Sequence, residues 1–253
     1  MPHSILITGA GARVGQALAL GLAQDGHAIA VHYNRSSQGA QSLVNKITAS
    51  GGKAAKVKAN LFVPQDLNSL IERAASSLGK PISGLINNAS TFAQDNAQDM
   101  SRSSYDHHMD INLRAPLMLS QDLANQLPNT AQGFIINMID QRVFKPNPTF
   151  FSYTVSKSAL HWATKTLAQS LAPNIRVNAI GPGPSLASIH QDERVFEAEA
   201  AATLLERGSP PETLLQAARY LIAAEAVTGQ MIAVDGGQHL TWQTPDITVQ
   251  TKD

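Results

Sequence analysis

Short apolar segments alternate with longer segments of helical periodicity along nearly the whole chain. Most of the short segments are apolar at successive positions, which is typical of strands whose two faces are both covered. Strands that alternate with helices predict parallel pairing, because each helix carries the chain back across the sheet before the next strand begins. This rhythm predicts an α/β fold with a doubly wound parallel sheet.

About seven strands and six helices account for most of the chain in this interpretation. The strands are predicted at residues 4–8, 28–33, 54–58, 84–87, 134–138, 175–180 and 231–234. The helices are predicted at residues 14–25, 38–50, 65–78, 105–127, 151–171 and 211–223. No linker rich in proline, glycine or serine divides them, so we expect one Rossmann-like domain over residues 1–242, with helices flanking the sheet. Residues 184–207 break the rhythm and are expected to form a lid over the site, or alternatively a surface insertion. Residues 243–253 are a polar tail.

Composition and charge narrow the class of partner. The chain has 19 basic and 19 acidic residues and no basic stripe with interleaved aromatic residues, so nucleic acid is not an expected partner. No apolar run approaches the roughly 18 residues that cross a membrane, and no charged leader precedes the first strand. We therefore expect a cytoplasmic protein without a membrane partner. The chain has no cysteine and its 8 histidines are scattered, so neither thiolate chemistry nor a metal site is expected.

A glycine-rich turn joins the first predicted strand to the first predicted helix. Gly9, Gly11 and Gly15 have the spacing Gly-x-Gly-x-x-x-Gly, and Arg13 and Val14 lie inside it. A tight turn at this place directs free backbone N–H groups and the positive end of the helix dipole towards a phosphate. Glycines alone are weak evidence, but their position between a strand and a helix predicts a site for the phosphates of a dinucleotide.

The end of the second strand indicates which dinucleotide binds. The chain there reads His32, Tyr33, Asn34, Arg35 and Ser36, with no acidic residue to accept from a ribose 2′-hydroxyl group. The guanidinium fork of Arg35 and the hydroxyl group of Ser36 suit a 2′-phosphate instead. We therefore predict NADP(H) as the cofactor. The alternative is that Arg35 is a solvated loop residue.

Polar residues and tight turns follow the later strands at the same predicted edge of the sheet. They are Asn88, Ala89 and Ser90 after the fourth strand, Asp140 after the fifth, and Pro182 and Gly183 after the sixth, with Asn112 on a helix facing the same edge. In an open parallel sheet, ligands bind beyond the carboxyl ends of the strands. The sequence thus predicts that the candidate catalytic and cofactor-binding residues lie together at one edge of the sheet.

Tyr153 and Lys157 lie four residues apart in a segment of helical periodicity, so they share one helix face. An ammonium about 4 Å from a phenol, at an effective dielectric constant of about 20, favours the phenolate by roughly 4 kcal/mol. We expect this interaction to lower the pKa of Tyr153 from about 10 towards neutral pH, where general-acid catalysis is most effective. The alternative is a buried tyrosine beside a solvated lysine.

Together these motifs resemble the short-chain dehydrogenase/reductase family. The resemblance extends from about residue 5 to about residue 240 and departs from the family at two places. The serine that the family has thirteen residues before the tyrosine is Asp140 here, and its aspartate after the third strand is Asn60, followed by Leu61. The resemblance implies that Asn60 and Leu61 lie beside the adenine of the cofactor. Asp140 implies either a lost activity or a branch with different chemistry.

One branch of this family, the pteridine reductases with the related dihydromonapterin reductases, also has aspartate at the serine position. The chain is similar to that branch at Arg13 and over residues 32–36, 88–92, 135–140 and 181–185. The resemblance implies that Phe92 stacks on a pterin, that Arg13 contacts the substrate or the phosphates, and that Ser185 lies beside the cofactor.

The resemblance also implies a division of catalytic roles. Tyr153 would protonate the nitrogen of a C=N bond, and Asp140 would orient and re-protonate Tyr153. Lys157 would bind the nicotinamide ribose, and Asn112 would hold a water molecule that relays protons. NADPH, a pterin-like substrate and a homotetramer are implied. Two alternatives stay open, namely an NADPH-dependent carbonyl reductase such as a 3-oxoacyl-carrier-protein reductase, and a catalytically silent NADP(H)-binding protein.

Overall fold

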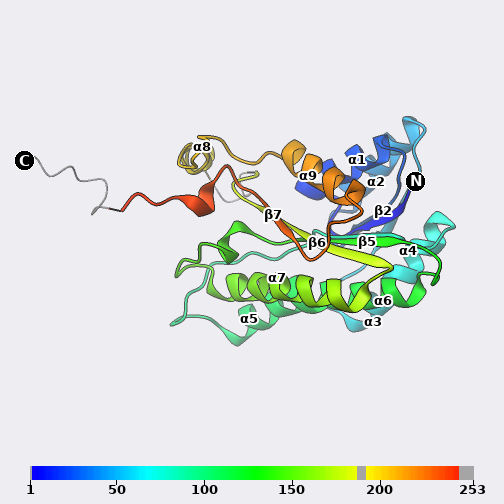
Figure 1. Ribbon diagram of the computed structural model, residues 1–253, viewed down its shortest axis with the longest axis horizontal. Helices are drawn as coiled ribbons and strands as arrows, with labels where there is room; N and C mark the ends of the chain where they lie inside the picture. The colour runs from blue at the N-terminus through cyan, green and yellow to red at the C-terminus, as the bar shows by residue number, and fades with distance from the viewer. Residues whose placement is uncertain (1, 187–191, 245–253) are drawn as a thin grey trace, which may run out of the picture.

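Seven parallel strands form a single sheet in the computed structural model, which describes residues 2–186 and 192–244 (Figure 1). The sheet order is β3-β2-β1-β4-β5-β6-β7, so the chain starts in the middle, winds to one edge, and then returns to build the other half. The strands are β1 (Ser4–Ile7), β2 (Ala28–Tyr33), β3 (Ala54–Lys58), β4 (Gly84–Asn87), β5 (Gly133–Met138), β6 (Ile175–Pro182) and β7 (Met231–Val234). The predicted doubly wound, Rossmann-like parallel sheet is confirmed.

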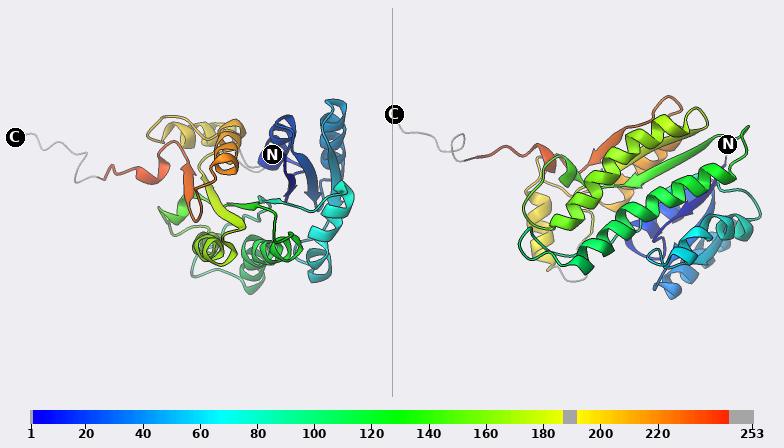
Figure 2. Two further views of the ribbon diagram at one scale, coloured as in Figure 1. Left: turned by 45° about the vertical axis from the view of Figure 1, so that its right-hand side comes forward. Right: turned by 90° about the horizontal axis from the view of Figure 1, so that it is seen from below.

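Helices cover both faces of this sheet (Figures 1 and 2). One face packs against α1 (Arg13–Gln24), α2 (Ser37–Ala49) and α9 (Pro211–Ala223), and the other against α4 (Leu70–Leu78), α6 (Ala115–Gln126) and α7 (Phe151–Leu171). Strand β1 shows why the apolar runs are continuous, because Ile5 and Ile7 enter the first core and Leu6 enters the second. The remaining elements are α3 (Pro64–Asn68), α5 (Arg102–Met109), α8 (Glu193–Ala201) and the short turns η1 (Asp110–Arg114), η2 (Gln141–Val143) and η3 (Gln238–Leu240).

Two predicted helices differ from the structure. The helix predicted at 65–78 is two helices, α3 and α4, which meet at Ser69. The helix predicted at 105–127 begins earlier, with α5, and passes through the π turn η1 before α6. Pro116 has no N–H group to offer the carbonyl group four residues earlier, so a regular helix cannot continue there. The N–H group of Ala115 instead bonds the Asp110 carbonyl group, which widens the helix by one residue at Asn112.

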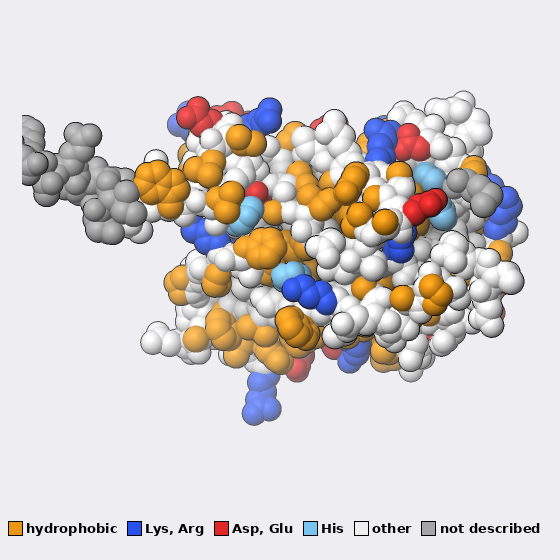
Figure 3. All heavy atoms as spheres, in the orientation of Figure 1, with side chains coloured by type: hydrophobic (Ala, Val, Ile, Leu, Met, Phe, Trp, Pro, Cys, Tyr) orange, Lys and Arg blue, Asp and Glu red, His pale blue; other side chains and the backbone are white. Residues whose placement is uncertain are grey.

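The residues that follow the parallel strands all lie at one edge of the sheet, as parallel pairing requires. Helix α8 occupies part of the interval 184–207 that was predicted to form a lid. The lid itself stays a prediction, and residues 187–191 of that interval lie outside the described residues, as do residues 245–253 of the predicted tail. On the face drawn in Figure 3, acidic and basic side chains are scattered among hydrophobic ones. Among the described residues, none of the helices is both long and apolar enough to cross a membrane.

Arg176 of β6 joins the end of α9 to the sheet. Its guanidinium group donates to the carbonyl groups of Leu221 at 2.7 Å, Ile222 at 2.8 Å and Ala224 at 3.1 Å. Carbonyl groups at a helix C-terminus have no hydrogen-bond donor within the helix, so Arg176 supplies donors for the last carbonyl groups of α9. The contact fixes the chain where it leaves α9 towards β7.

We predict that Arg176→Leu lowers the free energy of unfolding by about 2 to 3 kcal/mol, because it leaves partly buried carbonyl groups without a charged donor. Arg219→Leu is the matched control, since Arg219 pairs with Asp25 at the surface and its side chain is 43% exposed. The control is expected to lose less than about 1 kcal/mol. Urea denaturation followed by circular dichroism measures both values, and equal losses would contradict the role given to Arg176.

Candidate active site

The glycine turn rests on a buried histidine. The Gly9 N–H group donates to His32 Nδ1 at 3.0 Å, and His32 Nε2 lies 3.1 Å from the Ala59 carbonyl oxygen. The proton of the neutral ring is therefore on Nε2. Burial lowers the pKa of His32 to about 4, so the ring stays neutral at physiological pH. His32, predicted to bind the cofactor, instead supports the turn from beneath, with only 2% of its surface exposed.

The turn is tight because side chains are excluded from it. Gly9 has a φ of +66°, and a Cβ atom at Gly15 would lie 2.6 Å from Asn88 Nδ2. The Asn88 amide donates to the Thr8 carbonyl group at 2.8 Å and so ties the end of β4 to the turn. Helix α1 begins after Ala12 without a side-chain cap and without an acidic residue in its first turn. The N-terminus of α1 therefore fits a phosphate group, which its backbone N–H groups would bind.

A smaller cavity of about 430 Å³ lies at the end of β2, lined by Tyr33, Asn34, Arg35, Ser37 and Lys58. Arg35 and Lys58 bring two positive charges to it from neighbouring strands, and its lining contains no acidic residue. This chemistry fits a phosphate group. Lys58 was not predicted, although its register opposite Tyr33 on the neighbouring strand explains its position.

Asn60 and Leu61, predicted to lie beside adenine, follow β3 near this cavity. The Asn60 side-chain oxygen accepts from the Phe62 N–H group at 3.2 Å, and the Asn60 N–H group donates to Asp66 at 2.8 Å. Leu61 is buried, with 4% of its surface exposed. Ser36 precedes α2 and does not cap it with its side chain. These contacts give the loops a fixed shape and leave the predicted adenine contacts as predictions.

The main cavity has a volume of about 1020 Å³ and lies at the carboxyl edge of the sheet. The glycine turn, the segment after β4, η2, α7, the end of β6 and α8 all contribute to its wall. It brings together eleven of the predicted site residues, namely Arg13, Val14, Asn88, Ser90, Phe92, Asp140, Tyr153, Lys157, Pro182, Gly183 and Ser185. The cavity thus joins the proposed phosphate turn to the groups that can transfer protons.

Tyr153 and Asp140 form the central contact of this cavity. The Tyr153 hydroxyl group donates to Asp140 Oδ2 at 2.8 Å, and the Arg142 N–H group donates to Asp140 Oδ1 at 2.8 Å. Lys157 Nζ donates to the Met138 carbonyl group at 2.8 Å and lies 5.8 Å from the centre of the Tyr153 ring. The carboxylate, and not the ammonium, is therefore the hydrogen-bond partner of the phenol.

This arrangement reverses the expected pKa of the phenol. Burial and the charge of Asp140 raise the pKa of Tyr153 well above its ordinary value, so the prediction that Lys157 brings it near neutral pH is wrong. Burial also raises the pKa of Asp140. Burial lowers the pKa of Lys157 to about 8, against the opposing effect of the Asp140 charge. The phenol donates its proton to the carboxylate, and the Lys157 ammonium has a pKa of about 8, close to neutral pH.

Asn112 lies beneath the segment after β4 and is fully buried. Its side-chain oxygen accepts from the Thr91 N–H group at 2.9 Å and from the Ser90 hydroxyl group at 3.0 Å. Its amide group donates to the Thr91 carbonyl group at 3.0 Å and to Ser156 Oγ at 3.1 Å. Protein groups therefore occupy the whole side chain, so a water relay through the side chain of Asn112 does not fit the structure. The residue instead fixes the segment after β4 against α7.

An aromatic wall borders the cavity beside Tyr153. Phe92 is 49% exposed, stacks on Phe150 with 4.1 Å between ring centroids, and meets Tyr153 edge-on at 4.7 Å. Phe150 has a φ of +53°, a strained conformation for a bulky residue, immediately before α7. The sequence predicted a ring-stacking role for Phe92. It did not predict that Phe150, from a distant segment of the chain, packs against Phe92 in the folded protein.

Asp95 is a buried residue whose role the sequence did not reveal. Its Oδ1 atom accepts from the Ser152 N–H group at 3.1 Å, and the Ser152 hydroxyl group donates to Oδ2. His108 Nδ1 lies 2.7 Å from Ser152 Oγ, and the Ala93 N–H group donates to His108 Nε2 at 3.1 Å. Ser152 and His108 are at most 1% exposed, so this trio cannot attack a substrate. It caps α7 and fixes the segment that carries Phe92 relative to Tyr153.

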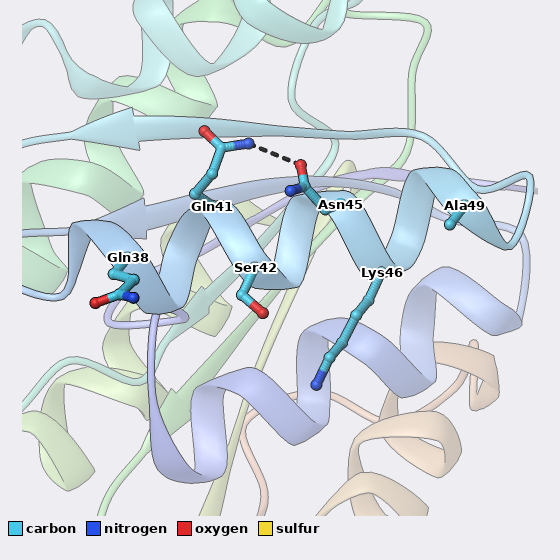
Figure 4. Close-up of a pocket in the computed structure, with 6 residues that line it drawn as sticks. All are labelled: Gln38, Gln41, Ser42, Asn45, Lys46 and Ala49. Carbon is cyan, nitrogen blue, oxygen red and sulfur yellow. Dashed lines mark hydrogen bonds between the residues drawn. The ribbon is translucent and has the colours of Figure 1, made fainter.

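A depression on the outer side of α2 does not combine residues from several elements as the main cavity does (Figure 4). It is lined by residues of that helix alone, and Gln41 donates to Asn45 at 2.8 Å within it. A binding site usually combines polar groups from several elements around an enclosed apolar surface. We therefore place the functional site in the main cavity.

A parallel sheet with a phosphate-binding turn after its first strand is the fold of dinucleotide-binding proteins, and here the proton-transfer groups lie in the cavity beside that turn. The family model of the short chain dehydrogenases matches residues 3–198. The chain belongs to the short-chain dehydrogenase/reductase family and is an oxidoreductase, as the motifs predicted.

Similar proteins span nearly the whole chain. The structure of FolM alternative dihydrofolate reductase 1 from Brucella suis in complex with NADP is 43% identical, and the match covers 97% of this chain and 98% of that chain with a TM-score of 0.94. An uncharacterized oxidoreductase of Methylorubrum extorquens is 31% identical over 240 residues, which are 92% of this chain and 96% of that protein. The 3-oxoacyl-(acyl-carrier-protein) reductase FabG of Staphylococcus epidermidis is 28% identical over 245 residues, with 95% and 100% covered.

We predict that the Lys157 ammonium titrates near pH 8 and that Asp140→Asn lowers this pKa further, because the substitution removes the negative charge that favours the ammonium. Nuclear magnetic resonance of ¹³C-labelled lysine side chains measures both titrations. The signals of surface lysines serve as the internal control and should not move between the two proteins. A higher Lys157 pKa in the variant would show that Asp140 does not act on the ammonium as described.

Proposed function

We propose that the protein is an NADPH-dependent reductase that transfers a hydride to the C=N bond of a dihydropterin-like substrate. One observation carries this proposal, namely the 2.8 Å hydrogen bond from Tyr153 to a partly buried carboxylate, Asp140, where the wider family has a serine. The exposed ring of Phe92 beside Tyr153 supports it, because a flat heteroaromatic ring stacks on such a wall.

The carboxylate favours a nitrogen heterocycle over a ketone. A serine hydroxyl group donates to a carbonyl oxygen, whereas a carboxylate accepts from a ring N–H group and a neighbouring amino group together. When bound, the cofactor supplies the hydride. The Asp140–Tyr153 pair then holds the proton that the substrate nitrogen takes up, and its raised pKa values keep that proton on the pair until the nitrogen becomes basic. Asp140 therefore acts as acceptor for the ring and as proton reservoir for Tyr153.

The cofactor proposal rests on two sites that fit phosphate groups. The uncapped N-terminus of α1 suits the pyrophosphate, and Arg35 with Lys58 suits the 2′-phosphate that distinguishes NADPH from NADH. The similar Brucella suis structure is a complex with NADP, which supports this assignment. The homotetramer implied by the family resemblance and the cytoplasmic location expected from the sequence both stay predictions.

A carbonyl reductase is the second candidate, because 3-oxoacyl-(acyl-carrier-protein) reductases are 28% identical over almost the full chain. Asp140 argues against it, since an ionised carboxylate repels the oxyanion that develops when a ketone is reduced. Turnover of acetoacetyl thioesters with NADPH would favour this candidate. Tight NADPH binding without turnover of any pterin or carbonyl compound would instead favour the silent NADP(H)-binding protein.

We predict that Asp140→Ala lowers kcat on 7,8-dihydrobiopterin by on the order of 10² to 10⁴, because the pair loses its proton reservoir. Asp25→Ala is the control, since that carboxylate pairs with Arg219 at the surface and should leave kcat unchanged. The rate of NADPH oxidation is the measurement. A change of less than about threefold in kcat for Asp140→Ala would remove the residue from the mechanism.

We predict that Arg35→Ala and Lys58→Ala each raise the KM for NADPH by roughly 10-fold or more while leaving the KM for NADH nearly unchanged, because each loses a charged contact to the 2′-phosphate. Lys46→Ala is the control, as that lysine lies on the outer depression of α2. If either substitution raised the KM for NADPH and the KM for NADH equally, the smaller cavity would not be the 2′-phosphate site.

A further inference from the structure

One buried imidazole ring joins two loops that leave different strands of the sheet. His32 lies near the end of β2, which pairs with β1 on one side and with β3 on the other. Its Nδ1 atom accepts from the Gly9 N–H group at 3.0 Å, and its Nε2 atom lies 3.1 Å from the Ala59 carbonyl oxygen. Gly9 belongs to the turn after β1, and Ala59 begins the loop after β3. The ring therefore connects these two loops across the end of β2.

The two loops serve different parts of a dinucleotide in the proposed cofactor site. The turn that contains Gly9 leads into α1, whose N-terminus fits the pyrophosphate. The loop after β3 follows Lys58, which lines the smaller cavity proposed for the 2′-phosphate. Asn34, another residue of that cavity, places its side-chain amide 3.5 Å from the Asn60 side-chain oxygen. His32 thus lies between the pyrophosphate end and the adenosine end of the site.

Both contacts of His32 depend on a neutral imidazole ring. Such a ring has an acceptor nitrogen on one side and a donor N–H group on the other, whereas the amides of asparagine and glutamine carry both groups on one carbon. The ring is 2% exposed and Ala59 is fully buried, so both contacts lie away from solvent. The backbone adds a parallel bond, since the Ala10 N–H group donates to the His32 carbonyl group at 2.9 Å. Losing a buried hydrogen bond is costly, so the ring holds Gly9 and Ala59 at a fixed separation.

The loop after β3 is rigid beyond its contact with His32. The Asn60 N–H group donates to Asp66 at 2.8 Å, and the Arg73 guanidinium group donates to the Lys58 carbonyl group at 2.7 Å and to the Asp66 carbonyl group at 3.0 Å. These bonds join the loop to α3 and α4. A contact at Ala59 therefore sets the position of the loop as a unit relative to the glycine turn.

We propose that His32 is a positioning residue for the cofactor, one that fixes the spacing between the pyrophosphate turn and the loop at the adenosine end. The proposal rests on the proposed cofactor sites, and the ring acts through the backbone of both loops because its own surface is covered. A ligand that binds at two points gains affinity when both points are already held at the matching distance. Loss of either hydrogen bond should therefore weaken a whole dinucleotide more than a fragment that contacts one loop.

Two substitutions break the two hydrogen bonds one at a time. His32→Asn places an amide oxygen near the position of Nδ1 and keeps the bond from Gly9, whereas His32→Gln reaches the Ala59 carbonyl group and loses the bond from Gly9. Each variant should raise the Kd for NADPH by roughly 10-fold, which fluorescence titration measures. In His32→Gln, the Kd for adenosine 2′-monophosphate, which lacks the pyrophosphate, should change by less than about twofold.

His27→Gln is the matched control at the opposite end of the same strand. His27 Nδ1 also accepts from a backbone N–H group, that of His3 at 2.9 Å, but it lies just before the start of β2. This variant should leave both Kd values unchanged. If His32 serves packing alone, its variants will lose thermal stability but bind NADPH as the wild-type protein does, and that result overturns the proposal. Equal losses for NADPH and the fragment in His32→Gln overturn it as well, because a general distortion of the site has that effect.

The wild-type protein provides a second test that does not depend on folding of the variants. Nuclear magnetic resonance of ¹⁵N-labelled protein detects the scalar coupling across the hydrogen bond between the Gly9 nitrogen and His32 Nδ1. We expect this coupling to persist when NADPH is bound. Its loss would show that the Gly9 N–H group turns to the cofactor instead, and would overturn the proposal.

Failure of the cofactor assignment gives a separate result. If adenosine 2′-monophosphate binds the wild-type protein no better than adenosine does, the smaller cavity is not the 2′-phosphate site. NADH and adenosine then replace NADPH and the fragment in the same comparison, which decides the role of His32 by the same outcomes.

Discussion

Buried hydrogen bonds at the carboxyl edge of the sheet hold the loops of the cavity in one arrangement. Asn88 ties the end of β4 to the glycine turn, Asn112 fixes the following segment to α7, and Asp95 caps α7 from that same segment. Each of these side chains is buried or partly buried, where a broken hydrogen bond leaves a desolvated polar group. The network therefore permits few alternative loop positions, and the distance between the phosphate turn and Tyr153 follows from it.

Asp140 changes the electrostatics that this edge would otherwise have. With a neutral partner, burial would still raise the pKa of Tyr153, but the further rise caused by the Asp140 charge would be absent. With a carboxylate at 2.8 Å, the phenol becomes a donor whose pKa rises, and the proton is retained at neutral pH. A substrate that becomes strongly basic on reduction can take a proton from such a pair. If the proposed function holds, a single change of residue type at this position would change which substrates suit the same fold.

The sequence predicted the sheet well because strands covered on both faces leave continuous apolar runs that do not depend on their partners. It predicted helix 105–127 less well, since Pro116 indicates a disturbed turn but not a π turn that starts at Asp110. Spacing placed Tyr153 and Lys157 on one helix face, yet the direction of the phenol pKa depends on burial and on Asp140, which only the folded chain shows. Phe150 and Asp95 escaped prediction for the same reason, because their partners come from distant segments.

The short turn η2 influences the electrostatics of the Asp140–Tyr153 pair. The backbone N–H group of Arg142 orients the Asp140 carboxylate, while its guanidinium group lies over Phe150 and lowers the pKa of Asp140 and Tyr153 through its charge. Any anion bound at the guanidinium group would weaken this effect, so the pKa of both groups would rise and the pair would be a weaker acid. The charge of Arg142 therefore helps the pair to release its proton to an acceptor in the cavity.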